Sequence, residues 1–317
     1  MTATVLGRDS TETLLHDALF YTDASSYRAG LLSFVREGLD ADEPVLVAVP
    51  QPGLGLLRSA LDPSEEARVR TLDMGVAGRN PGRIIGAVLT AFVHEHTGRN
   101  VRIVGEPIWA GRSTEEYPAC AEHEALINVA LGEAPAYVLC PYDVSKLDRS
   151  VLVDATRTHP MLASGDERWA SPGFTDPGIV AASFDRPLSP SPDHAEVLVI
   201  GPSTGPSGAR RFVHEHAERA GMTPERIADL RTAVQELVVN TLVHAGGPGL
   251  LSVWTADGQV VCQIQDGGRI ADPLIGRRPP EPPAVGHGLF TVHAVCDLVR
   301  VHRRSDGTTV RVHVNLR

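Results

Sequence analysis

Glu236 and Asn240 lie four residues apart in a stretch, residues 223–247, whose apolar residues recur at helical spacing. A spacing of four places a carboxylate and a carboxamide on the same helix face, one turn apart. Oxygen ligands of this kind can hold a hydrated Mg²⁺ ion that bridges the phosphates of a substrate. Taken alone, however, the pair also fits the polar face of an ordinary solvated helix.

Two motifs that contain glycine follow along the chain. Asp266-Gly267-Gly268 ends an alternating run that predicts a β-strand, and Gly286-His287-Gly288 opens a short predicted helix. The aspartate could accept a hydrogen bond from an adenine amino group, and glycine lets the backbone approach a nucleotide closely. Backbone N–H groups at the start of a helix favour phosphate. Each motif alone also fits an ordinary turn or hinge.

These motifs fall within one predicted α+β domain. Its expected elements are helices over residues 209–221 and 223–247, a hairpin around Asp257-Gly258, a loop rich in Pro and Gly over 267–287, a short helix, and a second hairpin around 305–307. This order predicts helices on one face of a largely antiparallel sheet.

The order and spacing of these segments resemble the Bergerat fold of the GHKL ATPases. The matching segments read QELVVNTLVHA, QDGGR, GHGL and DGTTV. The resemblance implies a domain that binds ATP with Mg²⁺, in which Asn240 coordinates the ion and Asp266 reads adenine. The residues that would bind the nucleotide and its ion are Asn240, Asp266, Gly268, Gly286, Gly288 and Thr308. Among them, Gly286 and Gly288 would belong to the ATP lid, and Thr308 would lie near adenine.

Within this superfamily, the domain resembles the anti-sigma-factor serine/threonine kinases. It is short, and a Pro/Ser-rich stretch precedes it where a histidine kinase carries a dimerising helical hairpin with a phospho-acceptor His. The resemblance implies a protein that controls a sigma factor by partner switching and phosphorylates an anti-anti-sigma protein on Ser or Thr, with Glu236 as the general base. Phosphoryl transfer depends mainly on positioning and charge neutralisation, so few protein groups are required.

Two features depart from the family pattern. Position 270 is Ile where the motif Asp-x-Gly-x-Gly would have Gly, and the predicted lid over residues 269–286 is rich in Pro. Two alternatives therefore stay open. One is a nucleotide-gated anti-sigma binding module without kinase activity, and the other is a sensor histidine kinase of atypical form.

Residues 13–160 alternate between predicted helices and short apolar strands, which predicts an α/β domain with a mostly parallel sheet. Three of its segments resemble the MEDS family of sensory domains: RNPGRIIGAV, VRIVGEPIWAGRSTEEYPACAEHEALINVAL and LCPYD. The resemblance implies a RecA-like outline without a phosphate-binding loop, and the sequence contains no GxxxxGK[ST] motif. Such a module would be a signal input that binds an unknown ligand.

Candidate ligand-binding residues of this domain gather near predicted strand ends, where open α/β sheets bind ligands, and on one helix. They are Arg102, Glu106, Trp109, Arg112, Glu124, Asn128, Cys140, Tyr142 and Asp143. A structural network of salt bridges would explain the same set. His16, Cys120, His123 and Cys140 could bind a soft metal, although cysteines without closely spaced ligand pairs are more often simply buried.

The composition limits the partners and the compartment. The chain has 317 residues and a formal net charge of -10, which argues against direct nucleic-acid binding because that needs clustered Lys and Arg. The N-terminus lacks a secretory signal pattern, the apolar runs are too short to cross a bilayer, and the cysteines are dispersed. We therefore expect a cytoplasmic protein without membrane contact, able to form a homodimer as relatives of the ATPase domain commonly do.

The chain is expected to have three parts. They are a sensory domain over residues 1–160, a linker over 161–205 rich in Pro, Ser and Gly, and an ATPase domain over 206–317.

Overall fold

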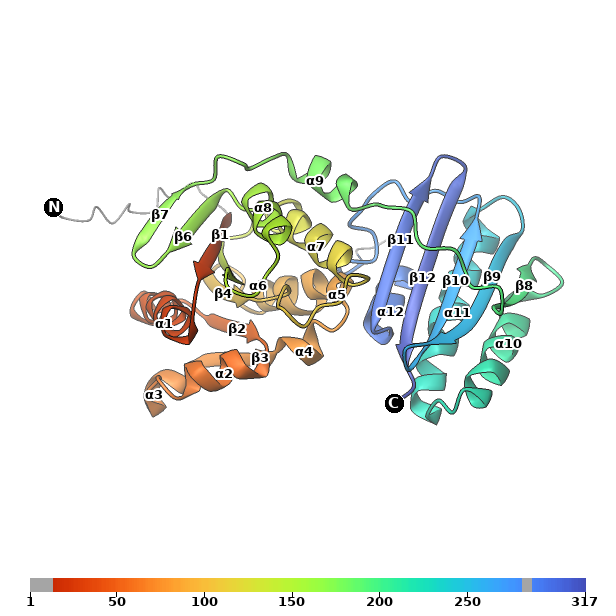
Figure 1. Ribbon diagram of the computed structural model, residues 1–317, viewed down its shortest axis with the longest axis horizontal. Helices are drawn as coiled ribbons and strands as arrows, with labels where there is room; N and C mark the ends of the chain where they lie inside the picture. The colour runs from red at the N-terminus through yellow and green to blue at the C-terminus, as the bar shows by residue number, and fades with distance from the viewer. Residues whose placement is uncertain (1–13, 281–286) are drawn as a thin grey trace. The chain divides into compact units, whose positions relative to one another are not determined.

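The computed structural model describes residues 14–280 and 287–317. The chain divides into two compact units, each with its own β-sheet (Figure 1). The first unit contains residues up to 77 together with 89–112 and 124–180, and the second contains 78–88, 113–123 and 181–317. Among the described residues, no helix combines the length and the apolar character needed to cross a membrane.

A seven-stranded sheet forms the centre of the first unit, in the order β3-β2-β4-β5-β1-β6-β7. Its strands are β1 (Leu14–Tyr21), β2 (Val45–Val49), β3 (Val69–Asp73), β4 (Val101–Gly105), β5 (Ala136–Asp143), β6 (Met161–Ser164) and β7 (Glu167–Ala170). Neighbouring strands pair in parallel except β6 and β7, which form an antiparallel pair at one edge. The predicted α/β domain with a mostly parallel sheet is confirmed.

Helices alternate with these strands along the chain. They are α1 (Ala24–Asp40), α2 (Gln51–Arg58), α3 (Pro63–Glu66), α4 (Met74–Ala77), α5 (Pro81–Ile84), the π-helix η1 (Ile85–Thr90), α6 (Ala91–Glu95), α7 (Tyr117–Ala130) and α8 (Arg149–Thr158). Asn80 caps α5, because its side chain accepts a hydrogen bond from the N–H of Gly82. The π-helix η1 lies between α5 and α6.

The core of the first unit surrounds the central strands. All five residues of β2 are buried, as expected for a parallel strand that is covered on both faces. Leu31 and Val35 of α1 are fully buried and pack in the same apolar cluster as Val47 of β2. This packing fixes the carboxyl ends of the strands, where the candidate ligand residues lie.

An antiparallel five-stranded sheet forms the second unit, in the order β11-β12-β10-β9-β8. Its elements are β8 (Glu196–Ile200), α10 (Gly205–Arg219), α11 (Pro224–His244), β9 (Gly249–Ala256), β10 (Gln259–Asp266), α12 (His287–Val295), β11 (Leu298–Arg304) and β12 (Gly307–Asn315). Buried side chains of the three helices and of the sheet form one apolar cluster, with the helices on one face (Figure 1). The predicted α+β domain is confirmed.

The hairpin between β9 and β10 turns at Asp257 and Gly258, whose φ angles are 50° and 74°. Positive φ at both central residues is the geometry of a type I′ turn, which Asp-Gly adopts readily. The hairpin predicted here is confirmed. The second predicted hairpin connects β11 and β12 around residues 305–307, also as expected.

The stretch predicted as a linker, residues 161–205, contains more structure than its composition indicates. Residues 161–170 form β6 and β7, because β6 pairs with β1 and so satisfies backbone groups that would otherwise stand open at the sheet edge. The helix α9 (Pro177–Ser183) follows. The strand β8 lies near the end of the stretch.

The part of this stretch before β8 packs against the sheet of the second unit (Figure 1). The Oδ1 atom of Asp185 lies 2.8 Å from Nδ1 of His302 on β11. The side-chain amide of Gln263 on β10 donates a hydrogen bond of 3.3 Å to Ser191 Oγ. Polar side chains of β10 and β11 thus bind this segment to the sheet, although its Pro and Ser content had predicted a linker.

Candidate functional site

The helix α11 presents Glu236 and Asn240 beside a buried stripe. Pro224 lies in its first turn and Glu225 places a carboxylate where the helix dipole favours one. Thr223 occupies the N-cap position, but its side chain makes no capping hydrogen bond. The buried stripe consists of Ile227, Leu230, Ala233, Val234, Leu237, Val238 and Thr241. Glu236 and Asn240 fall outside this stripe and are half-buried.

Asp266 stands at the end of β10 and joins that strand to α11. Thr241 Oγ1 donates a hydrogen bond of 2.6 Å to Asp266 Oδ2, and the N–H of Gly268 donates one of 2.9 Å to Oδ1. Thr308 lies opposite Asp266 on β12, and its hydroxyl donates to the carbonyl oxygen of Gly268 at 2.7 Å. The structure therefore brings together Asp266, Gly268 and Thr308. Each carboxylate oxygen of Asp266 keeps further acceptor capacity for a ligand.

Gly288 lies in the first turn of α12, next to the polar pair of α11. A Cβ atom at this position would lie 3.1 Å from Glu236 Oε2 and 3.4 Å from both Oδ1 and Nδ2 of Asn240. Glycine is the residue that leaves these side chains undisturbed. The first N–H groups of a helix have no partner within the helix. The N–H groups at the start of α12 therefore lie beside the carboxylate of Glu236 and the carboxamide of Asn240. Gly286, the other predicted lid residue, lies outside the described residues.

Thr241 connects the two halves of this arrangement, and the sequence did not single it out. It follows Asn240 directly, is fully buried, and holds Asp266. A hydroxyl inside an otherwise apolar helix stripe is the signal that could have identified it, because buried polar groups need partners. Gly307 also matters here, since a Cβ atom at its position would come within 1.9 Å of the carbonyl oxygen of Asp266.

The donor atoms of this arrangement are of the kinds that suit a metal ion, a phosphate group and a hydrogen-bond donor of a ligand. Glu236 and Asn240 supply oxygen atoms, which are the donors that Mg²⁺ takes. The start of α12 supplies backbone N–H groups suited to phosphate oxygens. Asp266 supplies a fixed acceptor that its two internal hydrogen bonds orient.

A pocket of about 270 Å³ opens at the carboxyl ends of the strands in the first unit. Tyr21 at the end of β1, Asp143 at the end of β5, and Glu106 and Trp109 after β4 contribute to its lining, together with Lys146. Glu106, Trp109 and Asp143 were candidate ligand residues from the sequence. Their position agrees with the general location of ligands in open α/β sheets.

The two arginines of the candidate set have structural roles instead. Arg102 forms ion pairs with Glu43 at 2.6 Å and with Glu37 at 3.1 Å. The guanidinium of Arg112 stacks over the ring of Trp109, 3.9 Å from its centroid. The salt-bridge alternative thus explains Arg102, whereas Arg112 orients a side chain that lines the pocket.

Glu106 is the most perturbed acid of this pocket. It is buried, and this burial raises the pKa of its carboxyl to about 8, although a hydrogen bond from the Tyr27 hydroxyl at 2.9 Å works in the opposite direction. The pKa of Tyr27 is itself raised, mainly by burial. Near neutral pH the pocket therefore presents an uncharged carboxyl and phenol groups, which can donate hydrogen bonds to a small polar ligand.

The four residues considered as soft-metal ligands do not all come together. His16 and Cys140 do, with 3.5 Å between Nε2 and Sγ. Among the described residues, the group whose ligand atoms converge consists of His16, Glu124, Cys140 and His159, without Cys120 or His123. Adjacent helix residues point about 100° apart, so Glu124 faces this pair where its neighbour His123 does not.

Comparison with protein families gives two matches. Residues 15–160 match the MEDS model, described as the MEthanogen/methylotroph, DcmR Sensory domain, and residues 206–314 match the Histidine kinase-like ATPase domain. Comparison with curated proteins gives no match. The resemblances to the MEDS family and to the GHKL ATPases are confirmed, and the chain carries a MEDS domain followed by a GHKL-like ATPase domain. Such an ATPase domain indicates ATP binding, usually with Mg²⁺, and a regulatory role.

Proposed function

We propose that this chain, with a MEDS domain ahead of a histidine kinase-like ATPase domain, is a cytoplasmic anti-sigma regulatory protein. It binds ATP with Mg²⁺, controls a sigma factor by partner switching, and phosphorylates an anti-anti-sigma protein on Ser or Thr. The observation that supports it best is the approach of Gly288 to Glu236 and Asn240. A helix start that meets two oxygen-bearing side chains is suited to nucleotide phosphates and their metal ion.

In this proposal the nucleotide is held at two places. Asn240 would hold the phosphate end through Mg²⁺, with the start of α12 at Gly288 beside it. Gly286, which the family resemblance assigns to the ATP lid, lies outside the described residues. Asp266 accepts a hydrogen bond from the adenine amino group, while Thr308 fixes the backbone at Gly268. When bound through ATP, Mg²⁺ would neutralise negative charge on the phosphates during transfer.

Glu236 is the proposed general base. Its carboxylate takes the proton from the Ser or Thr hydroxyl of the anti-anti-sigma protein as that oxygen forms a bond to the γ-phosphorus. The bond from this phosphorus to the β,γ-bridging oxygen breaks, and its electron pair leaves with ADP. General-base catalysis of this kind contributes roughly 10²–10⁴-fold to the rate.

The MEDS domain is the proposed input. Its pocket, lined by Glu106, Trp109 and Asp143 among others, would bind a small polar ligand and so report a signal to the ATPase domain. A homodimer through the ATPase domain is part of the same proposal.

A second candidate function is a nucleotide-gated anti-sigma module that binds ATP but transfers no phosphate. Ile270 favours it, because this residue replaces a glycine of the family motif and packs, partly buried, against the apolar cluster of the second unit. A side chain fixed in this way restrains the start of the lid, where glycine would let it move.

The test is a phosphorylation assay on the full chain. The protein is incubated with γ-labelled ATP and Mg²⁺ and with each anti-anti-sigma protein of the same host. Acid-stable phosphoserine or phosphothreonine on one of them is the expected result. ATP binding without transfer would establish the second candidate, and acid-labile phosphate on the chain itself would establish a histidine kinase.

A further inference from the structure

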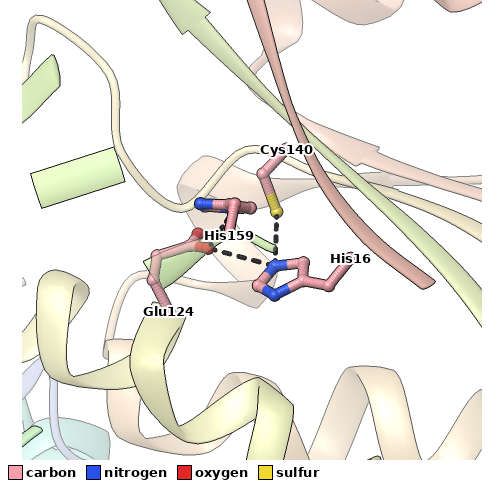
Figure 2. Close-up of side chains that lie close together, drawn as sticks. All are labelled: His16, Glu124, Cys140 and His159. Atoms are coloured by element: carbon pink, nitrogen blue, oxygen red, sulfur yellow. Dashed lines mark hydrogen bonds and ion pairs between the residues drawn. The ribbon is translucent and has the colours of Figure 1, made fainter. Parts of the chain in front are cut away.

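Four buried side chains with metal-binding atoms converge inside the first unit. His16 comes from β1, Cys140 from β5, Glu124 from α7, and His159 from the residue that follows α8. None of the four is more than 2% exposed. Their ligand atoms all lie within 4.8 Å of one another, and Figure 2 shows the carboxylate and the thiol directed toward the His16 ring.

The strand register explains how two of these residues meet. β1 and β5 are parallel neighbours, and Ala18 pairs with Cys140. His16 lies two residues before Ala18, so its side chain emerges on the same face of the sheet as that of Cys140. The ring nitrogen Nε2 of His16 and the sulfur of Cys140 are 3.5 Å apart.

The distances agree with a tetrahedral site. Glu124 Oε2 lies 3.4 Å from His16 Nε2 and 3.1 Å from His159 Nε2. A tetrahedral Zn²⁺ ion with bonds of about 2.0–2.3 Å separates its ligand atoms by roughly 3.3–3.6 Å. Three contacts of the cluster therefore already have nearly the spacing that such an ion would impose.

The surrounding hydrogen bonds direct the Nε2 atoms of both histidines into the cluster. His159 Nδ1 lies 2.9 Å from the carbonyl oxygen of Ala155, which can only accept, so Nδ1 carries the hydrogen. His16 Nδ1 lies 3.1 Å from Oδ1 of Asn128, whose amide donates to the carbonyl oxygen of Thr158. Metal-binding histidines have this second hydrogen bond almost always, and it leaves Nε2 with a free lone pair.

The buried polar atoms of the cluster are not fully satisfied by hydrogen bonds. Among the described residues, neither oxygen of Glu124 nor Nε2 of His159 has a partner in hydrogen-bonding geometry. Leaving buried polar atoms without partners is costly, and the cost is greater for a charge.

We propose that His16, Glu124, Cys140 and His159 bind one divalent transition-metal ion of the zinc class in a closed tetrahedral site. Cys140 binds as the thiolate, and its proton leaves to solvent as the metal–sulfur bond forms. One thiolate and one carboxylate balance the double charge of the ion, so the buried site is neutral overall. Nitrogen and sulfur donors select zinc-class metals over Mg²⁺ or Ca²⁺.

A role in structure follows from the closed ligand set. Four protein ligands leave no open position for a substrate or a water molecule, which is typical of structural sites. The ion would tie β1, β5, α7 and the end of α8 together, and metal binding would contribute directly to the stability of this unit. The proposal does not depend on nucleotide binding, because all four ligands lie in the first unit.

The first test measures metal in the full chain without any substitution. The protein is purified with Zn²⁺ present, passed through a desalting column, and analysed by elemental mass spectrometry and zinc X-ray absorption. We expect about one zinc per chain, with one sulfur and three nitrogen or oxygen neighbours as in mixed-ligand zinc sites. A folded chain with no bound zinc, or with zinc that has no sulfur or several sulfur neighbours, would overturn the proposal.

The second test uses Co²⁺ as a visible probe in the metal-free chain. The wild type should show thiolate-to-cobalt charge-transfer absorption and strong visible bands of tetrahedral Co²⁺. Cys140→Ser should lose the charge-transfer absorption, and Asn128→Leu should weaken binding by roughly 10–100-fold through the His16 ring. Cys262→Ala, which removes a buried thiol of the second unit, should leave the spectrum unchanged. A folded Cys140→Ser protein with the wild-type spectrum would refute the assignment.

Discussion

The predicted nucleotide site and the proposed metal site differ in how far apart in the chain their residues lie. In the second unit, Asp266 and Gly268 are two residues apart, and Glu236 and Asn240 are four apart. In the first unit, His16 and Cys140 meet across 124 residues. The residues of the predicted nucleotide site belong to short motifs, whereas each residue of the proposed metal site comes from a different part of the fold.

This difference decides what each site can do. Glu236, Asn240 and Asp266 of the predicted nucleotide site are half-buried, so they can meet a ligand that binds and dissociates. The ligand atoms of the cluster are closed off from solvent, so an ion there would exchange slowly and serve the fold. The pocket at Glu106 is intermediate in its exposure to solvent. It is open at the strand ends, yet the carboxyl of Glu106 is buried.

The largest expected effect is on phosphoryl transfer. Glu236→Gln should lower the transfer rate by roughly 10²–10⁴-fold, because the base that takes the hydroxyl proton is lost. ATP affinity and the metal content of the first unit should both stay close to wild type. Transfer rates are measured with γ-labelled ATP, and Glu225→Gln in the first turn of the same helix is the control. Equal rates for wild type and Glu236→Gln would remove the base from the mechanism.

The next largest expected effect is on ATP affinity, through the proposed contact between Asp266 and adenine. Asp266→Asn should weaken ATP binding by roughly 10–100-fold, the range expected for losing a hydrogen bond to a charged acceptor. Calorimetric titration measures the affinity, and Asp257→Asn at the other end of the β9–β10 hairpin is the matched control. If both variants bind ATP equally well, Asp266 does not contact the nucleotide.

A third prediction concerns the pocket of the first unit and its pH dependence. The pKa of Glu106 is about 8 in the folded chain against 4.5 for an ordinary glutamate, so the folded state holds more protons between these values. Its contribution to stability should therefore fall as pH rises through this window, by at most about 1.4 kcal/mol per pH unit.

Glu106→Gln should remove this slope. Urea unfolding at several pH values between 5 and 8, on the order of one unit apart, measures it for both proteins. Exposed Glu133 provides the control substitution Glu133→Gln, which should keep the wild-type slope. Parallel curves for wild type and Glu106→Gln would show that the carboxyl is ionised in the folded chain.

The smallest expected effect tests the close approach at the start of α12. Gly288→Ala should weaken ATP binding by roughly fivefold, about 1 kcal/mol, because the added methyl displaces Glu236 and Asn240. Gly201→Ala is the control, since a Cβ atom there meets nothing within 4 Å. A Gly288→Ala protein with unchanged affinity would mean that the nucleotide does not need this contact.

The sequence predicted the parts of the fold that depend on neighbouring residues. The helix α11 and the Asp257-Gly258 turn follow from local spacing and turn chemistry, and both are present. The central strand β1 was not identified, because buried His16 and Asp17 interrupt its apolar run. The edge strands β6 and β7 were read as linker, since pairing with β1 cannot be seen in their composition.

The two sites also differ in how far the sequence could predict them, because the sequence shows only relations between residues close together in the chain. The predicted nucleotide residues could be named because each belongs to a short motif that matches a motif of the GHKL family. Glu124 was a candidate ligand-binding residue but not a candidate metal ligand, and His159 was in neither set. No spacing connects these two residues, because the fold alone places them 3.1 Å apart.

The proposed nucleotide site is tested most directly by measuring the Mg²⁺-dependent binding of ATP to the full chain and to Asn240→Ala. Calorimetric titration should show ATP binding to the wild type that requires Mg²⁺, and a loss of at least about tenfold in affinity for Asn240→Ala. Thr232→Ala, exposed on the same helix, should bind like the wild type. Equal affinity in the folded Asn240→Ala protein, or binding that is indifferent to Mg²⁺, would contradict the proposed site.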